Sequence, residues 1–156
     1  MKSGINAKSV VLSFFVVLAL YGAAFYGIEY VRHRKGPWQV DFQVATSGDP
    51  VVEIAQTHLA LSGVKILFHG EHATNAPGTV RFDRVLQPVP FGRVIYEDLT
   101  FLPGVVTFDL FGHEIEILPR VLIVNKKTIP WQSGATLELW PTNKPAVPPE
   151  PPKAGR

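Results

Sequence analysis

Three acidic residues near the middle of the chain, Asp109, Glu114 and Glu116, have the types and spacing that come closest to a chemical site. Gly112-His113 separates two runs in which apolar and polar residues alternate, which predicts a β-hairpin with these two residues at the centre of its turn. That register pairs Asp109 with Glu116 and gathers all three carboxylates on one face. The opposite face is a predicted core face of Phe108, Leu110, Ile115 and Ile117.

Like charges directly opposite one another across two strands are unfavourable, so the acidic face needs a compensating partner. The simplest is a neighbouring arginine, and the candidates are Arg81, Arg93 and Arg120. The alternatives are a bound cation such as calcium, which takes several oxygen ligands, or a basic patch on a partner protein. We therefore treat this face as a possible interaction surface and predict no metal ligand there.

The histidines offer a second possible site. His69, Glu71 and His72 lie close together, whereas His58 and His113 are elsewhere in the chain. The helical HExxH spacing of zinc hydrolases is absent, and strand alternation places His69 and Glu71 on one face and His72 on the other. This pattern is typical of surface histidines at the end of a strand.

Residues for nucleophilic or cofactor chemistry are not found. The chain has no cysteine, no GxSxG or SxxK motif and no glycine-rich phosphate loop. The separation of carboxylate pairs, on which glycosidase chemistry depends, does not follow from the sequence. We therefore predict no catalytic residue and no cofactor, and we expect the protein not to be an enzyme.

The tryptophans suggest a binding surface. Trp38 falls on the inward face of a predicted strand, whereas Trp140 alternates with Leu137 and Leu139 and points outward. Trp131 follows Pro130 at the end of a strand. Exposed aromatic rings can stack on carbohydrate or rest at a membrane interface, so Trp131 and Trp140 are candidate binding residues.

These residues belong to a predicted all-β domain over residues 37–141. From Trp38 onward, apolar and polar residues alternate with a period of two in several short runs separated by Gly, Pro, Asn and Asp turns. Eight or so such strands predict an antiparallel β-sandwich, immunoglobulin-like or jelly-roll-like. The segment 120–125 is apolar on both faces, which predicts a central strand or one covered by a partner.

Residues 10–31 predict one N-terminal transmembrane helix. Such a helix would be about 33 Å long, enough for a hydrocarbon core of about 30 Å. A cleaved signal peptide is the alternative, but the apolar run continues past its possible cleavage site at Ala24. We therefore expect an uncleaved anchor, preceded by a short stub over residues 1–9 and followed by a basic linker over residues 32–36.

Ala19, Ala23 and Gly27 recur every four residues and line one face of this helix. Small side chains at this spacing allow two membrane helices to approach closely, so they are candidates for contact with another membrane protein or a copy of the chain. The basic residues on the two sides of the span are nearly balanced. The short N-terminal segment favours N-in, C-out, with the β domain extracytoplasmic.

Charge argues against nucleic-acid binding. The chain carries 15 basic and 13 acidic residues, but five basic residues lie in 1–35 and three in 142–156, each segment with one acid. The segment between them keeps seven basic and eleven acidic residues, a net charge of −4. A nucleic-acid-binding domain is expected to be basic. Residues 142–156 are rich in proline and predict a disordered tail.

Together these patterns predict a non-catalytic, membrane-anchored extracytoplasmic domain that acts as an interaction or accessory subunit of a membrane assembly. A carbohydrate- or lipid-binding module is the first alternative, and a metal-dependent hydrolase using the histidines or acidic residues is the second.

Overall fold

A computed structural model describes residues 7–145 of the chain. The chain divides into two compact units, one ending at Lys35 and one beginning at Gly36, which are described separately. Parts of the predicted stub and tail, residues 1–6 and 146–156, lie outside the described residues.

The first unit is a single helix, α1, which runs over Ala7–Lys35. Ala7–Arg32 is long and apolar enough to cross a membrane or to act as a signal sequence. The predicted span over residues 10–31 lies inside α1, but the predicted linker is helical as far as Lys35. The helix ends at Lys35, and the next residue, Gly36, has a φ of +68°, the left-handed conformation that commonly terminates helices; Pro37 follows.

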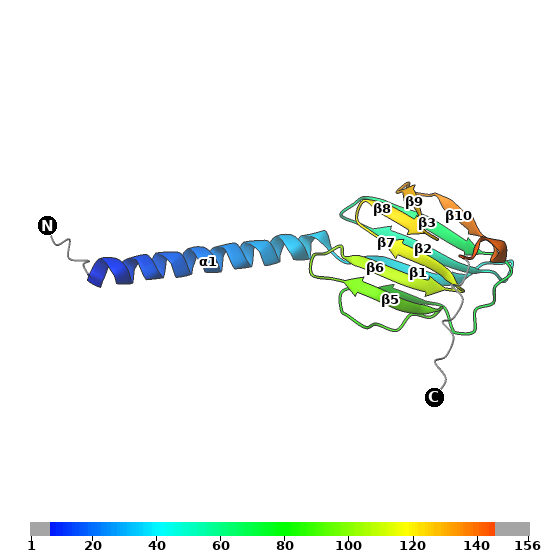
Figure 1. The fold of residues 1–156 in the computed structure, drawn as a ribbon, viewed down its shortest axis with the longest axis horizontal. Coiled ribbons are helices and arrows are strands. Elements are labelled where there is room, and N and C mark those ends of the chain that lie inside the picture. The colour runs from blue at the N-terminus through cyan, green and yellow to red at the C-terminus, as the bar shows by residue number, and fades with distance from the viewer. Residues whose placement is uncertain (1–6, 146–156) are drawn as a thin grey trace, which may run out of the picture. The chain divides into compact units, whose positions relative to one another are not determined.

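The second unit contains two five-stranded sheets (Figure 1). The first sheet has the strand order β10-β3-β2-β1-β4, and the second has the order β5-β6-β7-β8-β9. The strands of the first sheet are β1 (Gln39–Val44), β2 (Pro50–Gln56), β3 (Leu61–Phe68), β4 (Gly78–Arg81) and β10 (Thr136–Leu139). Those of the second are β5 (Arg93–Asp98), β6 (Val105–Leu110), β7 (His113–Ile117), β8 (Val121–Val124) and β9 (Lys127–Pro130).

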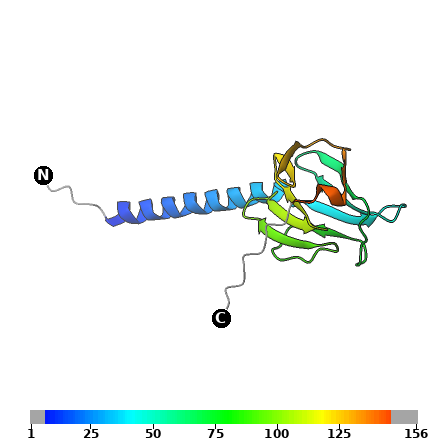
Figure 2. The same ribbon diagram turned by 45° about the vertical axis from the view of Figure 1, so that its right-hand side comes forward.

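The sheets form a β-sandwich around one core (Figures 1 and 2). In β2 and β7 every second residue is buried, as the period-two pattern predicts. Aromatic rings join the two layers: Phe42 of the first sheet contacts Phe108 of the second at 6.5 Å between ring centroids. Phe82, just after β4, contacts Phe108 at 5.4 Å. The predicted inward position of Trp38 is confirmed, because its side chain is fully buried.

The strand pairing differs from the prediction in one respect. The second sheet is antiparallel throughout, but in the first sheet β10 runs parallel to β3. Immunoglobulin-like and jelly-roll-like sandwiches are built from Greek-key connections. Here the chain passes from one sheet to the other between β4 and β5 and between β9 and β10, and the strand order confirms neither type. The doubly apolar strand β8 is central, between β7 and β9.

The predicted turn of the β6–β7 hairpin is one residue too late, so each predicted cross-strand partner is wrong by two residues. The turn is centred on Phe111-Gly112, so that Asp109 pairs with Glu114 and Leu110 with His113. Both turn residues have positive φ, +54° and +81°, which is characteristic of a type I′ turn. His113 is therefore a strand residue with a buried side chain, whereas the sequence predicts a turn residue.

Ordered structure continues past the predicted end of the domain at residue 141. A short 3-10 helix, η1, spans Pro141–Asn143. The Asn125 side-chain amide donates a hydrogen bond to the Asn143 carbonyl at 2.9 Å. Lys144 Nζ forms an ion pair with Glu71 at 2.6 Å. The first residues of the predicted tail thus contact the domain.

Candidate binding face around Trp140 and His69

The outer face of the first sheet, on the side away from the core, carries the candidate site. On β3 and the residue that follows it, Leu67 and His69 point outward because Phe68 between them is buried. On and just after β10, Glu138 and Trp140 point outward on either side of the buried Leu139. The parallel pairing of β3 with β10 sets these two pairs side by side.

Trp140 is an exposed aromatic ring in a fixed position. Its ring stacks on that of His69, with centroids 4.0 Å apart and planes inclined by 21°. The Trp140 backbone N–H donates to Asn143 Oδ1 at 3.2 Å, and the Asn143 N–H donates to the Trp140 carbonyl at 2.8 Å. Half of the Trp140 side chain remains exposed. The predicted outward position of this tryptophan is therefore confirmed.

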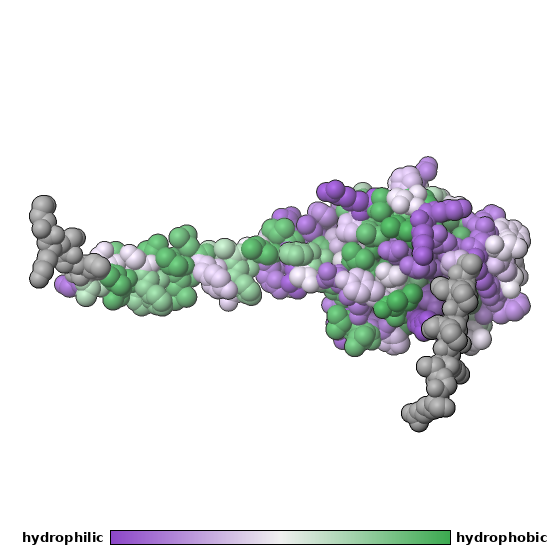
Figure 3. All heavy atoms as spheres, viewed as in Figure 1, coloured by the Kyte–Doolittle hydropathy of each residue, from purple (hydrophilic) through white to green (hydrophobic). Residues whose placement is uncertain are grey.

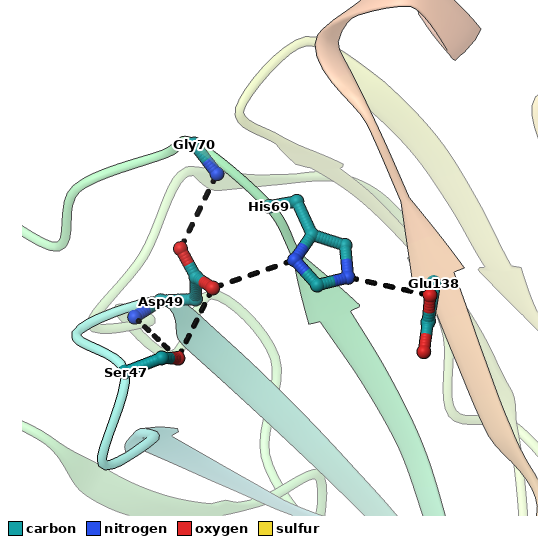
Figure 4. Close-up of polar contacts among 5 residues, drawn as sticks. All are labelled: Ser47, Asp49, His69, Gly70 and Glu138. Atoms are coloured by element: carbon teal, nitrogen blue, oxygen red, sulfur yellow. Dashed lines mark hydrogen bonds and ion pairs between the residues drawn. The ribbon is translucent and has the colours of Figure 1, made fainter.

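His69 lies between two carboxylates, that of Asp49 just before β2 and that of Glu138 on β10 (Figure 4). Its Nδ1 is 3.4 Å from Asp49 Oδ2, and its Nε2 is 3.4 Å from Glu138 Oε2. These distances are long for hydrogen bonds and suit ion pairs that strengthen when the ring is protonated. The two carboxylates hold the imidazole plane against Trp140.

Asp49 is in turn held by its own neighbours. The Ser47 hydroxyl donates to Asp49 Oδ2 at 3.1 Å, and the Gly70 N–H donates to Oδ1 at 3.2 Å (Figure 4). Desolvation raises the pKa of Asp49, but hydrogen bonds from Ser47, Gly70 and His69 together lower it below its usual value. Asp49 is therefore a carboxylate near neutral pH. Because Ser47 donates to Asp49 and not to His69, these residues do not form a serine-hydrolase triad.

A shallow groove of about 280 Å³ lies on the same face of the sheet. Its floor includes the apolar side chains of Val51 and Leu67, and the polar side chains that line it are Gln43, Thr46, Lys65 and Thr136. Leu67 is the register partner of Glu138 on β10 and of Val51 on β2. Leu67 and Glu138 are followed on the same face by His69 and Trp140, so the groove borders the Trp140–His69 pair.

The predicted acidic face lies on the second sheet, and its charge is partly compensated there. Arg93, one of the three candidate arginines, contacts Asp109 Oδ2 through Nε at 3.2 Å and through a terminal nitrogen at 3.1 Å. Asp109 also accepts a hydrogen bond from the Gly112 N–H at 3.1 Å. Glu114 faces Asp109 directly, and Glu116 faces Thr107. Within residues 7–145, no group of three or more potential ligands could hold a metal ion.

Trp131 and Trp140 do not form a shared site. The Trp131 ring packs on that of the buried Trp38 at 5.3 Å, and its Nε1–H donates to the Leu118 carbonyl at 2.8 Å. Trp131 comes before β10 and Trp140 directly after it, so that the two rings lie at opposite ends of the sandwich. Trp131 covers one end of the core, and Trp140 is the exposed ring.

The other candidate residues have simpler surroundings. Ala19, Ala23 and Gly27 are exposed on α1, and a methyl group added to Gly27 would meet no atom within 4 Å. His58 and His72 are exposed, as predicted for surface histidines.

The sequence pattern identifies His69 and Trp140 separately but misses Asp49 and Glu138 as partners of His69. The outward alternation of Glu138 and Trp140 is visible in the sequence. Their meeting with His69 depends on the β3–β10 pairing, which has no local signal.

Comparison with known proteins gives no relative: no family model, no curated protein and no solved structure matches this chain.

Proposed function

We propose that this is a single-pass membrane protein whose helix α1 anchors a non-catalytic β domain on the extracytoplasmic side. The domain binds a partner protein through the outer face of its first sheet, as a subunit of a membrane assembly. The observation that carries this proposal is the Trp140 ring, half exposed and held in place by its stack on His69.

A fixed, exposed tryptophan suits a protein contact. Tryptophan is enriched among the few residues that dominate binding energy, and a side chain already held in position loses little entropy on binding. The groove beside it offers apolar contact at Val51 and Leu67. Polar side chains surround this floor, which resembles the apolar centre and polar rim of many interfaces.

The charged residues around His69 support binding rather than catalysis. Both ring nitrogens of His69 face carboxylates of this chain, and Asp49 accepts hydrogen bonds at both of its oxygens. A general base must reach a substrate proton, whereas Nε2 of His69 is buried and makes no hydrogen bond within residues 7–145. These groups instead fix the orientation of the ring on which Trp140 rests.

The anchor contributes a second surface to the proposed assembly. Ala19, Ala23 and Gly27 on α1 would allow another membrane helix, or a copy of this one, to approach closely in the bilayer. Orientation N-in, C-out would place the Trp140 face outside the cytoplasm.

Affinity purification of the full chain from mild detergent tests the proposal. We expect a partner to co-purify with the wild type and to be lost with Trp140→Ala. Tyr96→Ala is the matched control, because Tyr96 is a similarly exposed aromatic residue (56%) on the second sheet. A monomer without partner in the wild type, or equal recovery of the partner with Trp140→Ala, would contradict the proposal.

A carbohydrate-binding function is the second candidate. The observation that favours it is an exposed indole ring on the same sheet face as a groove lined by hydroxyl and amide groups of Thr46, Thr136 and Gln43. A glycan array followed by titration of tryptophan fluorescence tests it, with Trp140→Phe removing the expected signal. If no glycan that binds on the array changes the tryptophan fluorescence of the protein, this candidate is eliminated.

A further inference from the structure

The most exposed large apolar side chains of the β domain are on two loops. Val85 and Leu86, in the connection from β4 to β5, are 64% and 88% exposed. Phe101, in the connection from β5 to β6, is 66% exposed. Figure 3 shows apolar surface, in green, at the lower edge of the domain, where Figure 1 draws β5 and its neighbouring loops.

The exposed residues of both loops lie at the end of the sandwich where β1 begins, which we call the entry end. The first loop starts beside Trp38, because the Phe82 N–H donates to the Trp38 carbonyl at 3.0 Å. The second loop ends beside it, because Trp38 Nε1–H donates to the Gly104 carbonyl at 2.6 Å. The Leu86 N–H donates to the side chain of Glu97, which joins the first loop to β5, the strand that leads into the second loop.

Specific backbone contacts hold these loops in conformations that leave their apolar side chains exposed. Leu86 has a φ of +59°, a left-handed conformation that is unfavourable for leucine and that its hydrogen bond to Glu97 maintains. A methyl group added to Gly104 would overlap the Asp98 carbonyl, so only glycine fits at this close approach. The Thr100 N–H donates to Asp98 Oδ1 at 3.0 Å and fixes the start of the second loop.

The entry end is also the part of the domain nearest to α1 along the chain. Only Gly36 and Pro37 separate Lys35, the last helical residue, from Trp38. Covalent geometry therefore keeps Trp38 within about 11 Å of the end of the helix, whatever angle the two units adopt. This short connection limits how far Trp38, at the end of the domain that carries these loops, can lie from a membrane that holds α1.

We propose that Val85, Leu86 and Phe101 insert into the headgroup region of the bilayer in which α1 is anchored. The occupant of this surface is lipid: apolar side chains enter the interface. Arg84, whose side chain is 84% exposed and lies 3.5 Å from Asp83, meets lipid phosphates. The inference rests on the proposed anchoring by α1. The proposed insertion gives the domain a fixed orientation, in which its entry end contacts the membrane.

That orientation would have a consequence for the Trp140 face. The strands β3 and β10 both start at the entry end and run away from it. His69 and Trp140 come directly after these strands, at the opposite end of the sandwich. Docking by the entry end would hold the Trp140–His69 pair on the side of the domain away from the bilayer, open to a partner.

Site-directed labelling of the full chain in nanodiscs of phosphatidylcholine and phosphatidylglycerol tests the proposal. Because the chain has no cysteine, Thr100→Cys provides a single attachment site for an environment-sensitive dye beside an intact Phe101. Lipids with a spin label near the headgroup should quench this dye and leave a dye at Thr46→Cys, at the far end, unquenched. Replacing Leu86 and Phe101 with serine in the Thr100→Cys chain should abolish the quenching.

The outcomes separate docking from anchoring. A chain that does not enter nanodiscs would contradict the anchor and, with it, the docking. A chain that enters, but whose dye at position 100 is unquenched, would contradict docking alone. Equal quenching in the chains with and without the Leu86 and Phe101 replacements would also contradict docking. The dye would then lie near the lipid only because α1 holds the domain there.

Discussion

His113 places an ionisable ring in the core of the domain, with 1% of its surface exposed. Its Nδ1 lies 2.9 Å from the Asn125 side-chain amide, and its Nε2 is buried and has no hydrogen-bond partner within residues 7–145. Burial lowers the pKa of His113, and the nearby Lys144 lowers it further, whereas the Asn125 hydrogen bond and the carboxylates of Glu71 and Asp109 oppose the shift. The ring is therefore held in its neutral form.

This environment predicts a loss of stability in mild acid. As the pH falls below about 6.5, the unfolded chain binds a proton at His113 before the folded chain does. The contribution of neutral His113 to the free energy of unfolding is thus complete above that pH and decreases below it. Urea unfolding in detergent at several pH values should show a steeper loss for the wild type than for His113→Gln. Parallel pH profiles for the two proteins would contradict this.

At the residue scale, the sequence predicts which side of a strand a side chain takes better than it predicts its neighbours. Alternation correctly places Trp38 inward and Trp140 outward. Arg93 is correctly among the candidates for Asp109 because of its charge. Asp49 and Glu138 lie far along the chain from His69, and nothing in the local pattern of either residue indicates that they meet there.

At the scale of elements, two tight turns define the register of the second sheet. Phe111-Gly112 joins β6 to β7, and Asn125-Lys126 joins β8 to β9 with φ values of +50° and +67°. The sequence predicts the first of these one residue too late, because glycine suits the first position of a type II′ turn as well as the second of type I′. The error shifts each partner by two residues, so the faces of the hairpin are unchanged.

The second turn predicts a stabilising substitution. A left-handed conformation costs a residue with a β-carbon about 1–2 kcal/mol, and Asn-Gly is the preferred pair in type I′ turns. Lys126→Gly should therefore raise the free energy of unfolding by about 1 kcal/mol, as measured by urea denaturation. Lys127→Gly, at the first residue of β9, is the control and should lower it by about 0.5–1 kcal/mol. A Lys126→Gly protein less stable than the wild type would show that the turn is not of this type.

The sequence predicts β3 and β10 as strands but does not predict that they pair. Each strand has the expected alternation, but their register partners, such as Lys65 and Thr136, are far apart in the chain. Antiparallel neighbours are joined by short turns with recognisable residues, whereas a long-range parallel pair has no such signal. The candidate face depends on this pair, which is why its residues could not be assembled from the sequence.

At the scale of the whole molecule, an apolar N-terminal helix and a two-sheet β domain both follow from the sequence, because their hydrophobic periods differ clearly. The type of sandwich does not follow, since it depends on which strands pair. The direction of the helix across a membrane depends on a nearly balanced distribution of basic residues on its two sides.

The proposed N-in, C-out orientation predicts a labelling pattern. A cysteine at Thr46 in the β domain should react with a membrane-impermeant maleimide in intact cells, whereas one at Lys8 should react only after lysis. The native chain is a clean background because it has no cysteine. The mass of the labelled protein should be that of the uncleaved chain. The reverse pattern would overturn the orientation, and a shorter mass would indicate a signal peptide.

The parallel position of β10 has a consequence for biogenesis. The strand that completes the first sheet is the last strand of the domain, so β3 keeps an unpaired edge until residue 139 has been synthesised and released. An exposed strand edge can pair with another chain. A nascent domain would therefore keep this edge open until β10 has been made, and a chaperone could protect it until then.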